Sequence, residues 1–85
     1  MKEFEYIIKA KNGLHARPAG KLASVSRGFE SEILVGLGNK VADGKRILSV
    51  MSLGAKCGEV LNFKISGVDE EKAMIELKSC CESEL

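Results

Sequence analysis

Apolar and polar residues alternate along the first ten residues of the chain. Every second position of residues 2–10, from Phe4 to Ala10, is apolar, and charged side chains occupy most of the positions between. A period of two is typical of a strand with one buried face. Lys11-Asn12-Gly13 then gives a turn signal. Further strands are predicted over residues 32–37, near 41–42 and over 59–66.

Apolar residues recur at helical spacing in three other stretches, 16–27, 46–53 and 70–81. Gly28 and Gly54 stand where the first two helices should end. The first helix should bury a narrow stripe of mostly small side chains, formed by Ala19, Leu22, Ala23 and Ser26.

The third helix has its own start signal. Asp69 is placed to act as its N-cap, and two glutamates follow in the first turn, where the helix dipole favours acids. The predicted order is therefore β-α-β-β-α-β-α. This order favours an α+β fold, an open-faced two-layer sandwich in which three helices cover one face of a four-stranded antiparallel sheet. We expect residues 1–85 to form a single domain, because the chain is too short for more.

Composition narrows the classes of function. A formal net charge of +1 argues against a dedicated nucleic-acid binder, which usually carries a large basic excess. No apolar run approaches the ~20 residues of a membrane span. The first residues are acidic where a signal peptide would be basic and then apolar. We therefore expect a cytoplasmic protein with no membrane insertion.

The cysteines and the single histidine give no framework for disulfides or metal. Cys57, Cys80 and Cys81 are an odd number, which suits a reducing compartment, and no Cys-x-x-Cys is present. One histidine leaves too few ligands for a zinc site, so we expect no metal. Cys80 and Cys81 fall on the inward stripe of the last helix and should be buried.

His15 is the only histidine, and it directly precedes the predicted first helix within residues 12–19, Asn-Gly-Leu-His-Ala-Arg-Pro-Ala. The backbone amides of Ala16 and Arg17 have no carbonyl partner four residues back, and Pro18 has no N–H to lose. The Arg17 guanidinium can add charged hydrogen bonds to phosphate oxygens. The pattern indicates a histidine that receives and passes on a phosphoryl group. The alternative is a histidine that only caps the helix or packs in a loop, which is commoner for such short motifs.

Two segments carry a family resemblance. Gly13–Ala19 and Val50–Gly54, with Lys45 ahead of the second, resemble the HPr family of histidine-containing phosphocarriers of the bacterial phosphoenolpyruvate-dependent sugar phosphotransferase system. The resemblance implies an open-faced sheet under three helices. It also implies that enzyme I phosphorylates the delta nitrogen of His15, that enzyme IIA domains collect the phosphoryl group, and that Arg17 is its electrostatic partner. Such a protein is a carrier and not an enzyme, and it needs no cofactor.

The resemblance further implies a docking surface made by the first helix and the short second one. The corresponding residues here are Gly20, Lys21, Ser24, Arg27, Ile47, Leu48 and Met51. For the last three a place in the hydrophobic core is an equally good interpretation, because a short helix also needs a buried stripe.

One position departs from many family members, which carry a regulatory serine just after the lysine that precedes the second helix. This chain has Lys45-Arg46 there, and arginine cannot accept that phosphorylation. We therefore predict that serine-kinase regulation is absent. Arg46 is either a plain surface charge or an aid to docking on acidic partners. The departure keeps open a regulatory paralogue, phosphorylated on His15 but acting on regulatory proteins in a control circuit. An independent hydrolase or kinase is disfavoured, because the chain has no Gly-rich phosphate loop and no second acid–base group beside His15.

Overall fold

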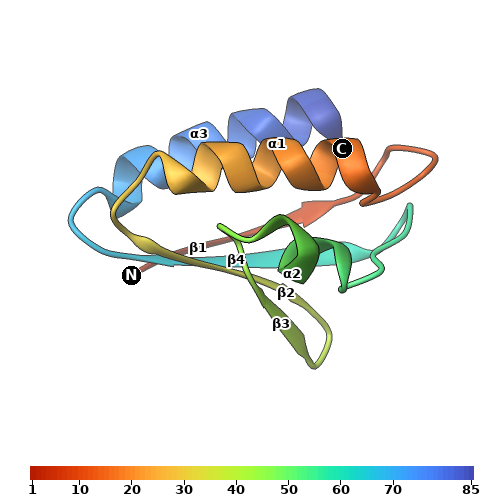
Figure 1. The fold of residues 1–85 in the computed structure, drawn as a ribbon, viewed down its shortest axis with the longest axis horizontal. Coiled ribbons are helices and arrows are strands. Elements are labelled where there is room, and N and C mark those ends of the chain that lie inside the picture. Colours follow the sequence, from red (N-terminus) through yellow and green to blue (C-terminus); the bar gives the residue numbers. More distant parts are fainter.

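The computed structural model describes residues 1–85 and contains four strands and three helices in the predicted order (Figure 1). Their bounds are β1 Lys2–Ile7, α1 Ala16–Arg27, β2 Glu32–Leu37, β3 Lys40–Asp43, α2 Ile47–Met51, β4 Val60–Ser66 and α3 Glu70–Glu84. The predicted α+β class is confirmed.

The four strands form one antiparallel sheet in the order β1-β4-β2-β3. The two central strands, β4 and β2, are therefore far apart in sequence, and the β2–β3 hairpin supplies one edge. Phe63 in β4 lies opposite Phe4 on one side and Val35 on the other. The rings of Phe4 and Phe63 stack with centroids 4.5 Å apart. Strand pairing thus places aromatic side chains on the face of the sheet that the helices cover.

Helices α1 and α3 lie side by side over one face of the sheet, and α2 packs beside α1 (Figure 1). The predicted inward stripe of α1 is confirmed, since Ala19, Leu22, Ala23 and Ser26 are all buried. Ala73, Leu77 and Cys81 form the matching buried stripe of α3. Small side chains on both stripes let the helices approach the sheet and each other closely.

Some element ends differ from the prediction. β1 ends at Ile7 and not at residue 10, because the Lys9 and Ala10 amides leave the sheet and donate to the Leu85 carbonyl at 2.7 and 2.6 Å. Helix α2 covers five residues and not the predicted eight, since the chain turns towards Gly54, which has φ +63°. Helix α3 continues beyond residue 81 to Glu84.

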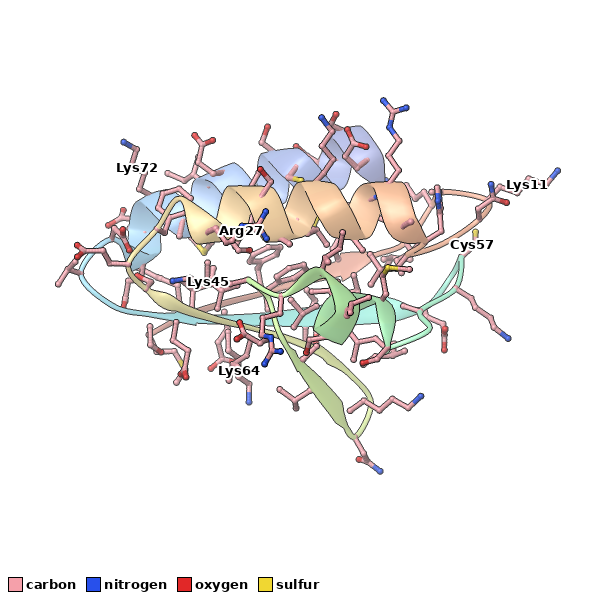
Figure 2. All side chains as sticks on the ribbon, viewed as in Figure 1. Lys11, Arg27, Lys45, Cys57, Lys64 and Lys72 are labelled. Carbon is pink, nitrogen blue, oxygen red and sulfur yellow. The ribbon has the colours of Figure 1, made fainter.

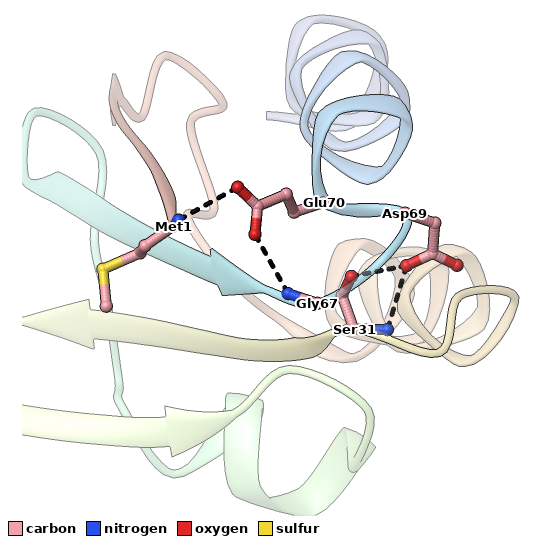
Figure 3. A network of polar contacts seen from close by, with 5 residues as sticks. All are labelled: Met1, Ser31, Gly67, Asp69 and Glu70. Carbon is pink, nitrogen blue, oxygen red and sulfur yellow. Dashed lines mark hydrogen bonds and ion pairs between the residues drawn. The ribbon is translucent and has the colours of Figure 1, made fainter.

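Asp69 takes the predicted N-cap position of α3, but its side chain makes no capping hydrogen bond to that helix. Its carboxylate accepts hydrogen bonds from the Ser31 backbone amide, at 3.0 Å, and from the Ser31 hydroxyl (Figure 3). It also accepts one from the Glu30 backbone amide at 2.9 Å. The prediction of a local cap was wrong because a loop 38 residues away offers three donors to the same carboxylate. Asp69 thus joins the start of α3 to the entry into β2.

Candidate functional site

The loop before α1 is held tightly by the loop that follows α2. Gly13 has φ +65°, and a Cβ there would lie 2.5 Å from the Ala55 carbonyl oxygen and 2.9 Å from the Lys56 Cα. Leu14 is buried, and its amide donates to the same Ala55 carbonyl at 2.9 Å. Only glycine fits this close approach. The position of His15 is thereby fixed from the residues just before it.

His15 is the N-cap residue of α1, as predicted. Its backbone is extended, with φ −89° and ψ −170°, and its carbonyl accepts the Ala19 amide at 3.0 Å. Its side chain makes no capping hydrogen bond and is exposed to solvent. The alternative of a capping or packed histidine is therefore wrong, and the imidazole is free to react with another molecule.

Two backbone donors stand open beside this ring. The amides of Ala16 and Arg17 have no hydrogen-bond partner within the protein, and Pro18 has no N–H. The first turn of α1 also contains no acidic side chain. Unpaired amides and the positive end of the helix dipole together favour an anion at this position.

Arg17 points towards α3. Its side chain is 78% exposed, and its Nε lies 4.0 Å from the Glu84 Oε1. The guanidinium therefore leans towards the end of α3 and makes no hydrogen bond to His15. Nothing in the sequence points to Glu84 as a neighbour of Arg17, because the contact depends on how α1 and α3 pack. An exposed ion pair at this distance is weak, so Arg17 can leave it at little cost.

The expected docking residues of α1 are where the periodicity placed them. Lys21, Ser24 and Arg27 are exposed, and Gly20 is half-buried at the contact with α2. A Cβ at Gly20 would lie 3.2 Å from the Ile47 Cδ1. The absence of a side chain at this glycine lets α2 lie close against α1, so that the two helices form one surface.

The apolar residues of α2 divide between surface and core. Leu48 is 77% exposed and Ile47 is 39% exposed, so the core interpretation is wrong for Leu48. Met51 is half-buried and packs against the core. Val50 is the fully buried residue of this helix. An exposed leucine beside α1 gives the surface an apolar centre.

Cations lie along α1 and at the start of α2, beside that apolar centre. The Arg27 Nη1 donates to the Lys45 carbonyl at 3.1 Å, and the Lys45 Nζ donates to the Phe29 carbonyl at 2.7 Å (Figure 2). Arg46 is exposed at the N-cap of α2, and its side chain makes no hydrogen bond or ion pair. Neither α1 nor residues 45–56 contain an acid. We call this surface the basic face; its cations are Arg17, Lys21, Arg27, Lys45, Arg46 and Lys56.

The cysteines lie outside this site or are inaccessible. Cys57 is exposed near the start of β4, at 3.7 Å from the Lys9 carbonyl (Figure 2). Cys81 is fully buried, and burial raises its thiol pKa to about 12. Cys80 is only partly buried, so the prediction of burial holds for Cys81 alone.

Helix α3, the longest at 15 residues, falls short of a membrane-spanning segment, and so do the other two.

Known proteins are similar to this chain in sequence and in fold. The family model described as "PTS HPr component phosphorylation site" matches residues 2–83. The phosphocarrier protein HPr of Mycoplasma genitalium is 41% identical over 83 residues, which are 96% of this chain and 94% of that protein. The multiphosphoryl transfer protein of Xanthomonas campestris is 32% identical over 80 residues, 94% of this chain but 10% of that protein. A crystal structure of HPr from Thermoanaerobacter tengcongensis matches with a TM-score of 0.93 at 42% identity, covering 99% of this chain and 94% of that one.

Proposed function

Because the chain belongs to the HPr family of phosphotransferase-system phosphocarriers, we propose that His15 accepts a phosphoryl group from enzyme I and passes it to enzyme IIA domains of sugar transporters. One observation carries this proposal: an exposed imidazole at the start of α1, next to the unpartnered amides of Ala16 and Arg17. In this role the protein is a cytoplasmic carrier that is transiently phosphorylated, not an enzyme, and it needs no cofactor.

The transfer step uses the lone pair on the His15 Nδ1. This nitrogen attacks the phosphorus of the donor, so that a new N–P bond forms while the bond from phosphorus to the donor breaks. The same bond then breaks when a nucleophile of the acceptor attacks. A ring that projects into solvent can enter the active sites of two different partners in turn, whereas a buried ring cannot.

The open amides and Arg17 stabilise the phosphorylated ring. The Ala16 and Arg17 N–H groups donate to phosphoryl oxygens at the helix start, where the dipole also favours negative charge. Arg17 leaves Glu84 and adds a charge-assisted hydrogen bond. These are few and exposed contacts, which suits a carrier that must hold the group and then release it.

The basic face is the surface on which the partner proteins dock. Leu48 offers an exposed apolar anchor next to α1, and the cations of the basic face surround it. An apolar centre with a charged rim is typical of protein interfaces. Complementary charge speeds encounter with acidic partners more than it tightens the complex. Arg46 adds to this rim and is one of the side chains we expect to contact acidic partners.

The direct test supplies phosphoenolpyruvate and enzyme I to the protein and to its His15→Ala variant. We expect one acid-labile phosphoryl group on the wild type and none on the variant. A Lys72→Ala variant, changed at an exposed position of α3, controls for unspecific effects and should accept the group normally. Absence of an adduct on the wild type, or persistence of the adduct in His15→Ala, would contradict the proposal.

The regulatory paralogue is the second candidate, and Arg46 is the observation that favours it. Both candidates load His15, so the discriminating step is the second transfer. Phosphorylated protein mixed with purified enzyme IIA domains should lose its label to them if it is a transport carrier. Retention of the label with every enzyme IIA domain tested would instead favour the control circuit.

The lack of serine regulation has its own test. A serine kinase of the HPr system should leave the wild type unmodified and modify Arg46→Ser. Modification of the wild type at Ser49 or Ser52, two other hydroxyls on this side of the molecule, would show that the switch has moved and is not lost.

A further inference from the structure

The basic face and the uncovered face of the sheet carry opposite charge. The basic face has no acid, whereas the uncovered face of the sheet holds four acids and one lysine, as strand alternation places them. These are Glu3, Glu5, Glu32, Asp43 and Lys64. Lys64 extends from the side of the sheet opposite α1 and α3 (Figure 2). The formal net charge of +1 conceals this division.

The uncovered face also contains a hollow of about 540 Å³, the one such hollow on the molecule. It lies away from His15. Glu3 and Glu5 line the hollow on the β1 side, and Leu34 and Val41 contribute apolar lining from β2 and β3. Gly36 leaves its middle open: a Cβ there would meet its nearest neighbour, the Lys40 carbonyl oxygen, at an ordinary 3.5 Å.

The side chains around the hollow are available for binding. Glu3, Glu5 and Lys64 take part in no ion pair within the protein. Val41 is 66% exposed on the edge strand. Beyond Glu5, the cross-strand neighbours Ile7 and Val60 extend the apolar surface, at 56% and 37% exposure. Contiguous exposed apolar surface, as opposed to single scattered residues, is typical of an interaction site.

We propose that this hollow is a second docking site, which binds an extended segment of a partner protein that alternates basic and aliphatic residues. Glu3 and Glu5 are two positions apart on β1, so their carboxylates repeat at about 7 Å along the strand. Lysine or arginine side chains at positions i and i+2 of an extended segment have the same repeat. Its aliphatic side chains contact Leu34 and Val41 in the hollow.

Charge decides between the possible occupants. A segment rich in acids would be repelled by Glu3 and Glu5, and Lys64 alone does not compensate for them. The partners that fit the basic face are therefore poor ligands for the hollow. Because the two surfaces lie on opposite sides of the sheet, a basic segment can occupy the hollow while His15 remains accessible.

The test uses a capped hexapeptide of alternating lysine and valine, titrated into isotopically labelled protein and followed by amide NMR shifts. We expect saturable shifts at Glu3, Glu5, Gly36 and Val41, with Kd below about 1 mM at low salt, and no shifts at α1. A hexapeptide of alternating glutamate and valine should give none. Shifts centred on α3 or on the basic face, no saturable shifts, or self-association through the sheet without peptide binding would each overturn the proposal.

Two variants separate a specific site from general attraction. Glu3→Gln with Glu5→Gln should weaken binding roughly tenfold, the loss expected for two exposed ion pairs, whereas Glu71→Gln with Glu76→Gln on α3 should not. A Cβ at Gly36 would meet its neighbours at ordinary contact distances, so Gly36→Val should occupy the hollow and abolish binding while the protein stays folded. If Gly36→Val binds as well as wild type, the hollow is not the site. All three variants should accept phosphoryl groups at His15 normally, so this proposal and the carrier function fail independently.

Discussion

The starts of α1 and α3 are built in opposite ways. α3 begins with Asp69, Glu70 and Glu71, and the Glu70 carboxylate accepts the Gly67 amide at 3.0 Å and lies 2.9 Å from the Met1 amino group (Figure 3). α1 begins with an exposed imidazole, no acid in the first turn and two amides without partners. One helix start carries carboxylates of the protein itself, whereas the other carries none.

The difference separates stability from function. Acids near a helix start and hydrogen bonds to its free amides stabilise a fold. At α1 the chain omits both, although serine, aspartate or threonine at position 15 could supply them. Open donors and a positive dipole end are what an incoming phosphoryl group requires. A local rule of stability is thus broken at the position where the protein is proposed to act.

The largest expected effect comes from a substitution of Gly13, the glycine that lets the loop before α1 pack against residues 55–56. Gly13→Ala puts a Cβ against the backbone of residues 55–56 at φ +65°, so we expect a loss of roughly 2–4 kcal/mol in the free energy of unfolding. Phosphoryl transfer at His15 should fall with it. Gly38→Ala is the matched control, since it has φ +59° but open space around the Cβ. Equal losses in the two variants would show that backbone strain alone matters.

The second-largest effect is expected from removing the Arg17 guanidinium at the start of α1. Arg17→Gln deletes a charged hydrogen bond to the phosphoryl group, so the phosphorylated form should lose about 1–3 kcal/mol of stabilisation relative to the free form. The measurement is the equilibrium of phosphoryl exchange with enzyme I. Glu84→Gln, which removes only the resting partner of Arg17, should leave that equilibrium unchanged or shift it towards the phosphorylated form. A shift in the opposite direction would contradict the proposed movement of Arg17.

Adding a side-chain cap to α1 should increase stability and remove function. His15→Ser can satisfy one open amide, and we expect it to stabilise the protein by about 1 kcal/mol while abolishing phosphoryl acceptance. His15→Ala should abolish acceptance with a change in stability within about 0.5 kcal/mol, because the exposed ring makes no capping bond. Chemical denaturation of the three proteins measures both. If His15→Ser is less stable than the wild type, the uncapped start of α1 does not lower the stability of the protein.

The smallest expected effect is the response of the α3 start to acid. Hydrogen bonds from the Ser31 hydroxyl and the Glu30 amide lower the Asp69 pKa below its ordinary 3.8, and the Gly67 amide lowers the Glu70 pKa below 4.5. The unfolded chain therefore binds protons first, so stability falls as the pH drops through these values. Asp69→Asn should flatten this fall in the melting temperature between about pH 5 and pH 2. If the melting temperature of Asp69→Asn falls with pH as steeply as that of the wild type, Asp69 does not cause the loss of stability in acid.

The sequence predicts the parts of this fold that depend on local chemistry. The buried stripe of α1 and the position of His15 follow from helical spacing and turn residues, and both are confirmed. The bonding of Asp69 to the Ser31 loop, the exposure of Leu48 and the approach of Glu84 to Arg17 did not follow. Each depends on how separate elements pack, and periodicity within one element carries no information about that.

The separation of charge between the two faces has a consequence for encounter in solution. The six cations of the basic face lie in two segments, α1 and residues 45–56, that contain no acid, and four acids lie on the uncovered face of the sheet. The electric field of an approaching anionic protein attracts the basic face and repels the uncovered face, and so exerts a torque on the molecule. Rotation during diffusion then turns the imidazole towards that protein before any atoms touch. Dissolved salt, by screening the field, slows the association.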